Sequence, residues 1–312
     1  MLSRTANGLF WLARHMERLD YVARLLDVAQ RMSVLGGAKS PSEWTSALAA
    51  SGSGHAFAAK HGAVTPKAVI DWLARDPDNP SSILSCLATA RENARAVRGA
   101  LTSDMWEALN TAFLDARRFK GGDFEESGLT TTLDWFKMQS LLFNGAYSNT
   151  MLRQGPFFFV RLGTFVERAD NTARLLDVKY HVLLPSVEEV GGGVDYYQWI
   201  AILRAVSARR AYHFVYAERI RPWHVAELLI LRQEMPRSLR SCYEQIVAQL
   251  DALAEGQGGR VGECHRQAGE THARLRYGRI EAIFQDGLHE FLTESIVRTR
   301  ALGLEIEDFY FA

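Results

Sequence analysis

The sequence predicts an all-α protein, a multi-helix bundle packed as a single domain over residues 1–312. Apolar residues recur at helical spacing along most of the chain, and the alternation typical of strands is nearly absent. Serine, threonine and proline precede the apolar runs, while glycine and proline follow them, as expected at helix starts and ends. The hydrophobic fraction of 47% and the charged fraction of 23% are ordinary for a globular protein.

Five helices are expected in the first half of the chain. The first runs from Ser3, its N-cap, to about Ser33, and Gly36-Gly37 ends it. Residues 38–64 are rich in Ser, Gly and Ala, so they are expected to hold short helices at most. Because proline is tolerated in the first turn of a helix, Pro66 and Pro80 mark two further starts. The later helices are expected over residues 66–74, 80–101, 103–120 and 129–152.

The second half begins with another long helix, from about Pro156 to Leu184. The run Gly191-Gly192-Gly193 predicts a hinge or tight loop, because it lacks the lysine and the spacing of a phosphate-binding loop. A glycine-rich surface linker is expected at residues 256–259. Further helices are expected over residues 195–218, 222–233, 237–254 and 263–302, the last with bends near Gly278 and Gly287, followed by a short tail over 305–312.

Charge and cysteine content exclude several classes of protein. The 36 basic and 36 acidic residues give a formal net charge of +0, so no nucleic acid or anionic membrane is expected as a partner. The three cysteines include no C-x-x-C pair, which argues against a disulfide scaffold or a zinc ribbon. Neither a signal peptide nor an apolar run of 18 residues is visible, so a cytoplasmic protein is expected.

An internal repeat is the strongest pattern in the chain. Residues 17–28 and 167–178 are identical at nine of twelve positions, at a constant offset of 150. This repeat predicts two internally related halves, about residues 1–150 and 151–312, each contributing an equivalent helix. We expect those two helices to pack together about a pseudo-twofold axis.

The repeat carries its charged side chains in a narrow stripe. At about 100° per residue, a stripe roughly 80° wide holds Glu17, Asp20, Arg24 and Asp27 in the first copy, and Glu167, Asp170, Arg174 and Asp177 in the second. Apolar residues flank the stripe on both sides, so its charges are expected to be partly desolvated and therefore paired. Each arginine of the stripe follows an aspartate by four residues and can pair with it.

Glu17 and Glu167 are the candidate catalytic residues, because neither has an arginine four residues further on. If the two carboxyl groups approached each other, one would hold a raised pKa and could act as an acid or a base. The alternative is a structural salt-bridge network that fixes the register of the helices. Arg18 and Arg168 lie about 100° from the stripe and are expected to serve a different neighbour. The candidate ligand-binding residues are Arg18, Asp20, Arg24, Arg91, Arg95, Arg168, Asp170 and Arg174.

A second charged face is expected on the helix that follows Pro80. Arg91, Arg95 and Arg98 lie at i, i+4 and i+7 and share this face. These arginines either meet the acidic stripes or clamp a carboxylate or phosphate, for which the guanidinium fork is suited.

Other chemistries fit the sequence less well. The paired carboxylates lack the Glu-x-x-His of di-iron bundles, and nearby arginines would repel a cation, so neither a metal nor a cofactor is predicted. Cys86 is a possible nucleophile, but a buried apolar role fits it better. Tyr196, Tyr197 and Trp199 either dock a partner or make ordinary core contacts, and the second interpretation is favoured. A local basic cluster, interpreted as a solvated helix end, comprises Arg209, Arg210, Arg219 and Arg221.

With these motifs in place, the chain resembles the bacterial alpha-E domain family, an all-helical family named for a Glu-Arg motif. The matches occur in order over nearly the whole chain. They comprise Leu2-Ser3-Arg4, Ala6-Asn7, Glu17-Arg18, residues 90–95, Val97-Arg98, Trp106-Glu107, Asn110, Glu167-Arg168 with Asp170, residues 225–229, residues 236–238 and Gly287-Leu288-His289. Trp11 departs from the tyrosine that is commoner near the first motif.

The resemblance implies partners more than it implies a reaction. Members of the family tend to be encoded beside, or fused to, circularly permuted ATP-grasp proteins and transglutaminase-like peptidases. ATP-grasp enzymes make amide bonds through an acyl-phosphate, so the resemblance implies synthesis or modification of a peptide or amino-acid conjugate. We therefore expect an accessory or scaffold subunit of such a system. The alternative is an enzyme of the pathway, in which Glu17 and Glu167 act as acid and base while Arg91 and Arg95 hold an anionic substrate.

Overall fold

The computed structural model describes residues 2–35, 42–182 and 193–312, and every regular element within these ranges is a helix. The first-half helices are α1 (Ser3–Leu35), α2 (Ser42–Ser51), α3 (Gly54–Lys60), α4 (Pro66–Ala74), α5 (Ile83–Ala96), η1 (Arg98–Ala100), α6 (Ser103–Ala116), η2 (Gly121–Phe124) and α7 (Glu126–Thr150). The second-half helices are α8 (Gly155–Val182), α9 (Gly193–Ala205), α10 (Arg209–Tyr216), α11 (Pro222–Ile230), α12 (Leu239–Glu255), α13 (Glu263–Tyr277), α14 (Ile280–Asp286) and α15 (Leu288–Tyr310). The predicted all-α bundle is confirmed.

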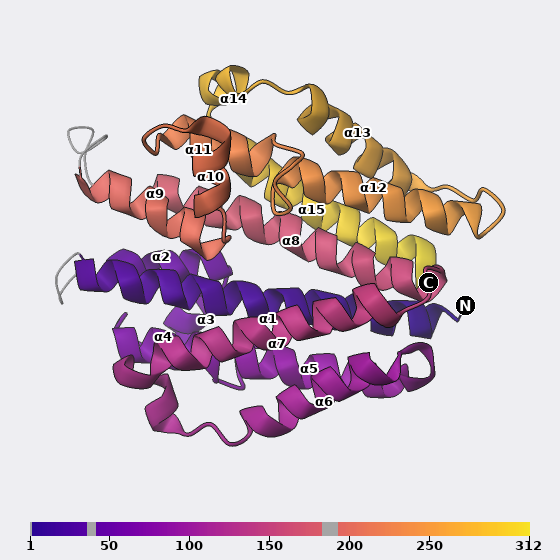
Figure 1. The fold of residues 1–312 in the computed structure, drawn as a ribbon, viewed down its shortest axis with the longest axis horizontal. Helices are drawn as coiled ribbons and strands as arrows, with labels where there is room; N and C mark the ends of the chain where they lie inside the picture. Colours follow the sequence, from indigo (N-terminus) through magenta and orange to yellow (C-terminus); the bar gives the residue numbers. More distant parts are fainter. Residues whose placement is uncertain (1, 36–41, 183–192) are drawn as a thin grey trace.

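Two long helices, α1 and α8, form the centre of the bundle and carry the two copies of the repeat. They lie side by side, with α5, α6 and α7 on the α1 side and α12, α13 and α15 on the α8 side (Figure 1). The expected contact between the repeat helices is therefore present. A relation between the whole halves remains a prediction from the sequence.

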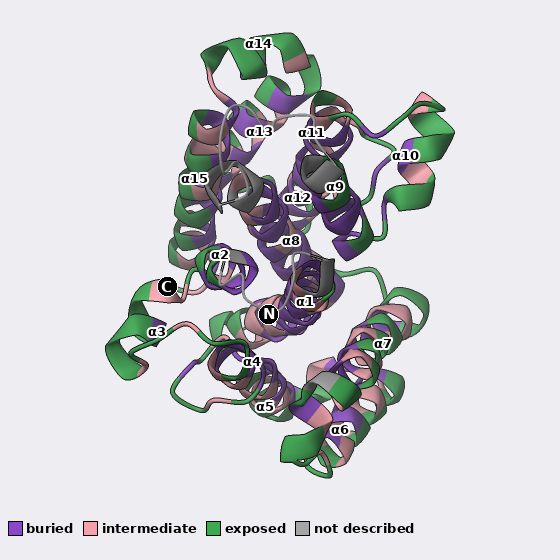
Figure 2. Ribbon diagram, turned by 90° about the vertical axis from the view of Figure 1, so that its left-hand side faces the viewer, coloured by how far each residue is buried: buried purple, intermediate pink, exposed green. Residues whose placement is uncertain are grey.

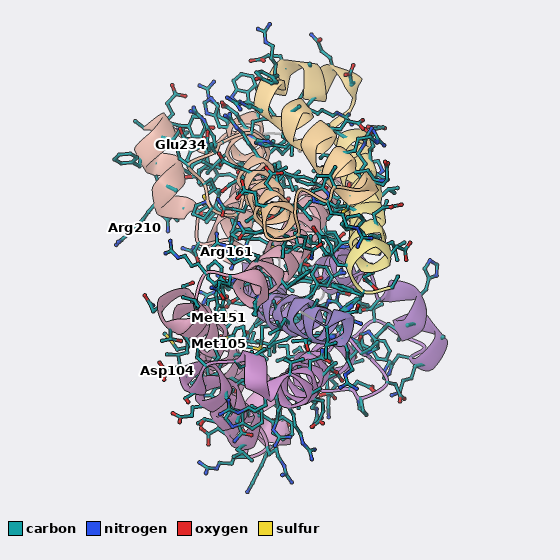
Figure 3. All side chains as sticks on the ribbon, turned by 90° about the vertical axis from the view of Figure 1, so that its right-hand side faces the viewer. Asp104, Met105, Met151, Arg161, Arg210 and Glu234 are labelled. Atoms are coloured by element: carbon teal, nitrogen blue, oxygen red, sulfur yellow. The ribbon has the colours of Figure 1, made fainter. Side chains whose placement is uncertain are left out.

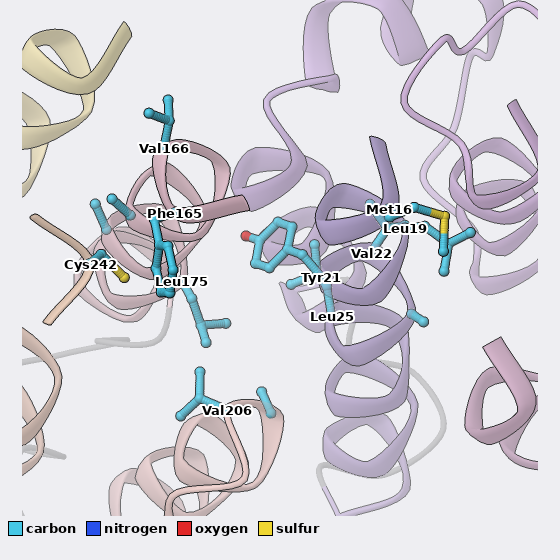
Figure 4. Close-up of a cluster of buried hydrophobic side chains, with 14 of the residues drawn as sticks. Met16, Leu19, Tyr21, Val22, Leu25, Phe165, Val166, Leu175, Val206 and Cys242 are labelled. Atoms are coloured by element: carbon cyan, nitrogen blue, oxygen red, sulfur yellow. The ribbon is translucent and has the colours of Figure 1, made fainter. Parts of the chain in front are cut away.

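Burial follows the helical periodicity of α1. Leu9, Leu12, Met16 and Leu19 are almost completely buried against neighbouring helices. The buried faces of all the central helices point inward, while the outer faces of α6, α7 and α14 remain exposed (Figure 2). Apolar side chains from α1 and α8, including Tyr21 and Leu175, fill the space between these helices and their neighbours (Figure 4). Among the described helices, none combines the length and the apolar character needed for a membrane span.

Several predicted helices are interrupted. One helix was expected over residues 195–218. The structure has two helices here, α9 and α10, separated by a turn in which Ser207 adopts a left-handed φ of 56°. The helix expected over 263–302 divides at Gly278 and Gly287 into three, because Gly287 has a φ of 104° that suits glycine. The predicted tail over 305–312 is wrong, since α15 continues to Tyr310.

The starts of two helices also differ from the prediction. Ser82, and not the Asn79-Pro80 pair, caps α5, with its hydroxyl accepting from the Ser85 amide. Thr102 rather than Ser103 caps α6. Predicted features at Gly36-Gly37, Leu184 and Gly191-Gly192 lie outside the described residues.

The close crossing of α1 and α8 depends on a glycine. A side-chain carbon added at Gly163 would collide with the backbone carbonyl of Phe10, which cannot move without shifting α1. The two backbones therefore approach more closely here than any larger residue allows.

We predict that Gly163→Ala lowers the free energy of unfolding by about 1–3 kcal/mol, because the added methyl group forces α1 and α8 apart. Denaturant unfolding measures the effect. Gly269→Ala is the matched control, since space around this α13 glycine is open and alanine favours helix by up to about 1 kcal/mol. Equal stabilities for the two variants would contradict the close crossing.

Candidate functional site

The two repeated Glu-Arg pairs bind each other reciprocally across the interface between α1 and α8. Arg168 donates from Nε to Glu17 Oε1 at 2.9 Å and from Nη2 to Oε2 at 2.8 Å. Arg18 donates in the same two-pronged way to Glu167, at 2.6 and 3.1 Å. Each glutamate is thus neutralised by the arginine that follows the other glutamate, and both pairs are bidentate, the stronger geometry for this contact.

This exchange corrects the expectation that Arg18 and Arg168 serve a different neighbour from the stripe. Their backbone positions do differ from the glutamates by about 100°. The long arginine side chains nevertheless reach across the interface to the opposite helix. Because adjacent residues point in directions about 100° apart, the glutamate of each Glu-Arg pair is buried while its arginine lies at the edge of the contact. The Arg18 side chain, for example, is 21% exposed.

Two further arginines complete the coordination of the glutamates, and they differ between the two copies. Arg14, on α1, donates to Glu167 at 2.9 Å. Arg237, just before α12, donates to Glu17 and to Asp20, at 2.7 Å each. Thr164 occupies the repeat position equivalent to Arg14, so the exchange is symmetric in its central pairs only.

Sequence reasoning missed Arg14, and it included Arg237 in the family match over residues 236–238 but not among the candidate site residues. The neighbour Ser238 caps α12, with its hydroxyl accepting from the Ser241 amide, and this places Arg237 at the bundle centre. No spacing on α1 or α8 points to a residue so distant in sequence. The only signal for Arg14 was its position one turn before Arg18.

The remaining stripe residues pair as their spacing predicts. Arg24 donates to Asp20 at 2.8 Å, and Arg174 donates to Asp170 at 2.6 Å. Asp27 then reaches outward to Lys137 of α7, at 3.2 Å. The equivalent Asp177 reaches His289 of α15. The stripe thus ties each central helix to one helix of the outer layer.

Both candidate glutamates are held as anions. Burial alone would raise the pKa of Glu17, but the charges of Arg168 and Arg237 outweigh it and lower the pKa to about 2. Burial would also raise the pKa of Glu167, but the charges of Arg18 and Arg14 outweigh it and lower the pKa to about 2. Neither glutamate therefore has the raised pKa that a catalytic acid or base would need. Each glutamate faces arginines, and not the other glutamate.

Two buried cysteines lie beside the exchanged arginines. Burial raises the pKa of Cys86 and of Cys242 to about 12, although Arg18 and Arg168 respectively oppose the increase. Both thiols are thus protonated at neutral pH, and Cys86 fills space in the core instead of acting as a nucleophile.

The arginine face of α5 does not meet the acidic stripes. Arg91 donates to Asn110 of α6 at 2.9 Å and stacks over Phe113. Arg95 is 71% exposed, with Glu92 3.8 Å away, and Arg98 lies over Trp106. Alanine and leucine residues of α5 face the core instead, so this arginine face turns toward α6 and solvent. The structure therefore places every candidate ligand-binding residue except Arg91 and Arg95 along the α1–α8 pair, in three sets of contacts. Arg18 binds Glu167, Asp20 and Arg24 join Arg168 around Glu17 and Arg237, and Asp170 pairs with Arg174.

A small cavity adjoins the network at the α9 end. Its volume is about 10 Å³, space for roughly one water molecule. Arg24, Asn171 and Arg237 line it, and the Nδ2 of Asn171 has no hydrogen-bond partner among the described residues. Within the network, Asp20 Oδ1 is likewise buried without a hydrogen-bond partner among the described residues. Among the described residues this space is too small for an amino acid or peptide. Nowhere in the described part of the chain do three His, Cys, Asp or Glu side chains form a group that could hold a metal ion.

The network also fixes the turn between α9 and α10. Arg24 Nη1 donates to the carbonyl of Ala205 at 3.1 Å and to the hydroxyl of Ser207 at 3.0 Å. Ser207 is the residue with the left-handed backbone, so the guanidinium stabilises a strained turn. The position of α10 therefore depends on the central charges.

The fold and this network define a class of all-helical protein whose two central helices are joined by exchanged Glu-Arg pairs. The chain belongs to the Alpha-E family, described as a predicted alpha-helical domain with a conserved ER motif, whose family model matches residues 1–311. Uncharacterised proteins of Mycobacterium bovis and Mycobacterium tuberculosis are 25% identical to it over 333 residues. The match covers 98% of this chain and 36% of those proteins, so the chain spans about a third of their length. No solved structure matches the chain significantly.

We predict that Glu17→Gln lowers the free energy of unfolding by about 3–5 kcal/mol, because it leaves Arg168 buried without a counter-charge and removes one of the two acids that pair with Arg237. Thermal and denaturant unfolding measure the loss. Glu263→Gln, which removes an exposed partner of Arg266, is expected to leave the melting temperature unchanged. Retained stability in Glu17→Gln would contradict a structural role for the network.

We also predict that stability falls in two stages on acidification. The pKa of His15 is lowered to about 4, chiefly by burial and then by Arg18, so protonation favours the unfolded chain as pH falls from 6.5 to 4. Glu17 and Glu167 have a pKa near 2 in the folded chain and an ordinary pKa of 4.5 in the unfolded chain. Their contribution to the free energy of unfolding is therefore complete above pH 4.5 and is lost as the pH falls toward 2.

Denaturant unfolding at several pH values between 7 and 3 tests these two stages. In His15→Gln, the free energy of unfolding should fall less between pH 6.5 and 4, while the loss below pH 4.5 that comes from the glutamates should remain. A free energy of unfolding that stays constant down to pH 3 would show that the glutamates are not held as anions.

Proposed function

We propose that this chain is an accessory or scaffold subunit that works beside a circularly permuted ATP-grasp ligase in the cytoplasm. The system would synthesise or modify a peptide or amino-acid conjugate. The observation that carries the scaffold role is the occupation of both candidate glutamates by arginines, two on each carboxylate. Such carboxylates stabilise the helix pair and are not free to move a proton.

The relatives support a role alongside other protein segments. In the mycobacterial proteins the matching region makes up 36% of a longer chain. The fold therefore occurs there covalently joined to further sequence. A subunit that works with a separate ligase is consistent with such an arrangement, and a transglutaminase-like protein is a second proposed partner.

An exposed feature supports partner binding. Residues 209–223, which we call the basic arm, contain four arginines and one glutamate. Phe214 within the arm is 91% exposed and Trp223 is 50% exposed. Aromatic and arginine side chains are enriched where protein partners bind most strongly. The arm stands to one side of the bundle (Figure 2), with Arg210 pointing into solvent (Figure 3).

The arm is held in one conformation before any partner arrives. The Tyr212 hydroxyl donates to the Arg219 carbonyl and accepts from the Arg221 amide, both at 2.9 Å. Tyr216 stacks on His224 at 4.3 Å between ring centres. Arg24 fixes the turn that leads into it. Because the arm is already ordered, less conformational entropy is lost when a partner binds to it.

The alternative proposal, an enzyme of the same pathway that uses the Glu/Asp/Arg residues as a pocket, makes a different demand on Glu17. A catalytic Glu17 requires that Glu17→Gln abolish product while stability is largely kept. The scaffold proposal expects the stability loss instead. The cavity of about 10 Å³ beside the network supports the scaffold proposal.

We predict that the chain co-purifies with a circularly permuted ATP-grasp ligase of the same organism and changes its ATP turnover. The double variant Phe214→Ala, Arg210→Glu should weaken the complex at least about tenfold, because it removes an exposed aromatic side chain and reverses one charge. Tyr277→Ala, at a tyrosine 75% exposed outside the arm, is the matched control and should bind normally.

Two results would contradict the proposal. Absence of a complex, with unchanged ATP turnover, would remove the accessory role. A complex that both variants leave intact would place the binding surface elsewhere on the bundle.

A further inference from the structure

The basic arm carries positive charges that the rest of the described chain leaves without a counter-charge. Arg209, Arg210 and Arg219 are exposed and make no ion pair with any described residue. Arg221 differs, since Glu218 lies 3.7 Å away. In the central network, by contrast, each arginine contacts a carboxylate. Because like charges in one short segment repel one another, an acidic partner would stabilise the arm.

Aromatic side chains lie among these arginines. Arg210 and Phe214 are four residues apart on α10, so they are neighbours on the helix surface. Tyr212 is completely buried on the opposite side of the same helix. Beyond α10, the guanidinium of Arg221 lies 5.7 Å from the ring centre of Trp223. The two exposed rings, Phe214 and Trp223, therefore each lie next to an arginine.

We infer that the basic arm binds an acidic segment of a partner protein, in which carboxylates flank a bulky apolar side chain. The apolar side chain packs on Phe214, and the carboxylates accept hydrogen bonds from Arg209 and Arg210. This inference rests on the proposed function only in taking the arm as a binding surface, and it adds the chemistry of the segment that binds.

The type of cation supports a carboxylate as the group that is bound. The arm contains four arginines and no lysine. A guanidinium group is planar and donates two parallel hydrogen bonds to one carboxylate, whereas an ammonium group acts as a point charge. The same two-pronged contact joins Arg168 to Glu17 at the centre of this fold.

The charges favour a protein segment over an anionic membrane, the other surface that arginine and aromatic side chains meet. The formal net charge of +0 gives the chain no long-range attraction to a negative bilayer. Glu218, which is 54% exposed, places a negative charge within the arm that lipid headgroups would repel. A protein segment has to match the arm alone, because charges at physiological salt act over only about 8 Å.

A short peptide is long enough to make this contact. The eight residues of α10 span roughly 12 Å. An extended peptide of about twelve residues reaches roughly 40 Å and therefore crosses the whole helix. The probe is such a peptide with blocked ends, in which glutamates flank one phenylalanine and serines fill the other positions.

Isothermal titration calorimetry of the full 312-residue chain with this peptide tests the inference. One peptide should bind per chain, and binding should weaken as salt rises from about 50 to about 500 mM, because the contact is between charges. A second peptide with glutamine in place of every glutamate should bind at least about tenfold more weakly.

Reversing the charges of the arm tests where the peptide binds. The double variant Arg209→Glu, Arg210→Glu should bind the acidic peptide at least about tenfold more weakly, and it should bind a version with lysine in place of glutamate instead. Neither arginine has a partner to lose, so the melting temperature should not change. The matched control is Arg117→Glu, Arg118→Glu, an adjacent exposed pair at the end of α6, and it should bind the acidic peptide normally.

Three results would overturn the inference. The acidic peptide fails to bind, or the glutamine peptide binds equally well, or both double variants bind the acidic peptide like the original chain. Vesicles containing about a third phosphatidylserine should not bind the chain. Binding to these vesicles that is lost in Arg209→Glu, Arg210→Glu would assign the arm to an anionic membrane and would also overturn the inference.

The peptide experiment is independent of the ligase. A ligase complex that forms through the arm, together with an acidic peptide that does not bind, would overturn this inference and leave the proposed accessory role in place. Peptide binding at the arm without any ligase complex would support this inference and contradict the accessory role.

Discussion

The structure depends on the burial of two carboxylates between its central helices. A buried glutamate without a partner costs several kcal/mol, so the interface between α1 and α8 is stable only when arginines reach both Glu17 and Glu167. The bundle meets this requirement by exchange, since each helix supplies the arginine for the other's glutamate. Only one alignment of the helices satisfies both pairs at once. A slide of one helix by a single residue would break four charge-assisted hydrogen bonds.

The consequences of this exchange extend outward. Asp27 and Asp177 continue the two stripes to α7 and α15, and Arg24 continues one of them to the turn before α10. The outer layer and the exposed arm are therefore held in register with the centre. A fold organised in this way is suited to presenting surfaces at fixed positions, and this supports the scaffold role that we propose.

Much of this arrangement could be predicted from the sequence, and the failures have identifiable causes. The repeat and its stripe revealed the central helices, the burial of Glu17 and the pairing of Arg24 with Asp20, because all depend on local spacing. The partners of the glutamates could not be predicted by spacing, since Arg237 comes from a distant helix start. The α5 arginines show the opposite error. Their shared face was real, but α6 and not α1 packs near it, and no pattern within α5 distinguishes the two. Ser207 breaks a helix through a backbone conformation that propensity disfavours.

The central claim is that the Glu-Arg pairs are exchanged between helices. A double-mutant cycle of Glu17→Gln with Arg168→Gln measures that coupling directly, and a second cycle of Glu17→Gln with Arg18→Gln serves as its control. The exchange predicts a coupling free energy of at least about 2 kcal/mol for Glu17 with Arg168, and a value close to zero for Glu17 with Arg18. A large coupling for Glu17 with Arg18, or none for Glu17 with Arg168, would contradict the account.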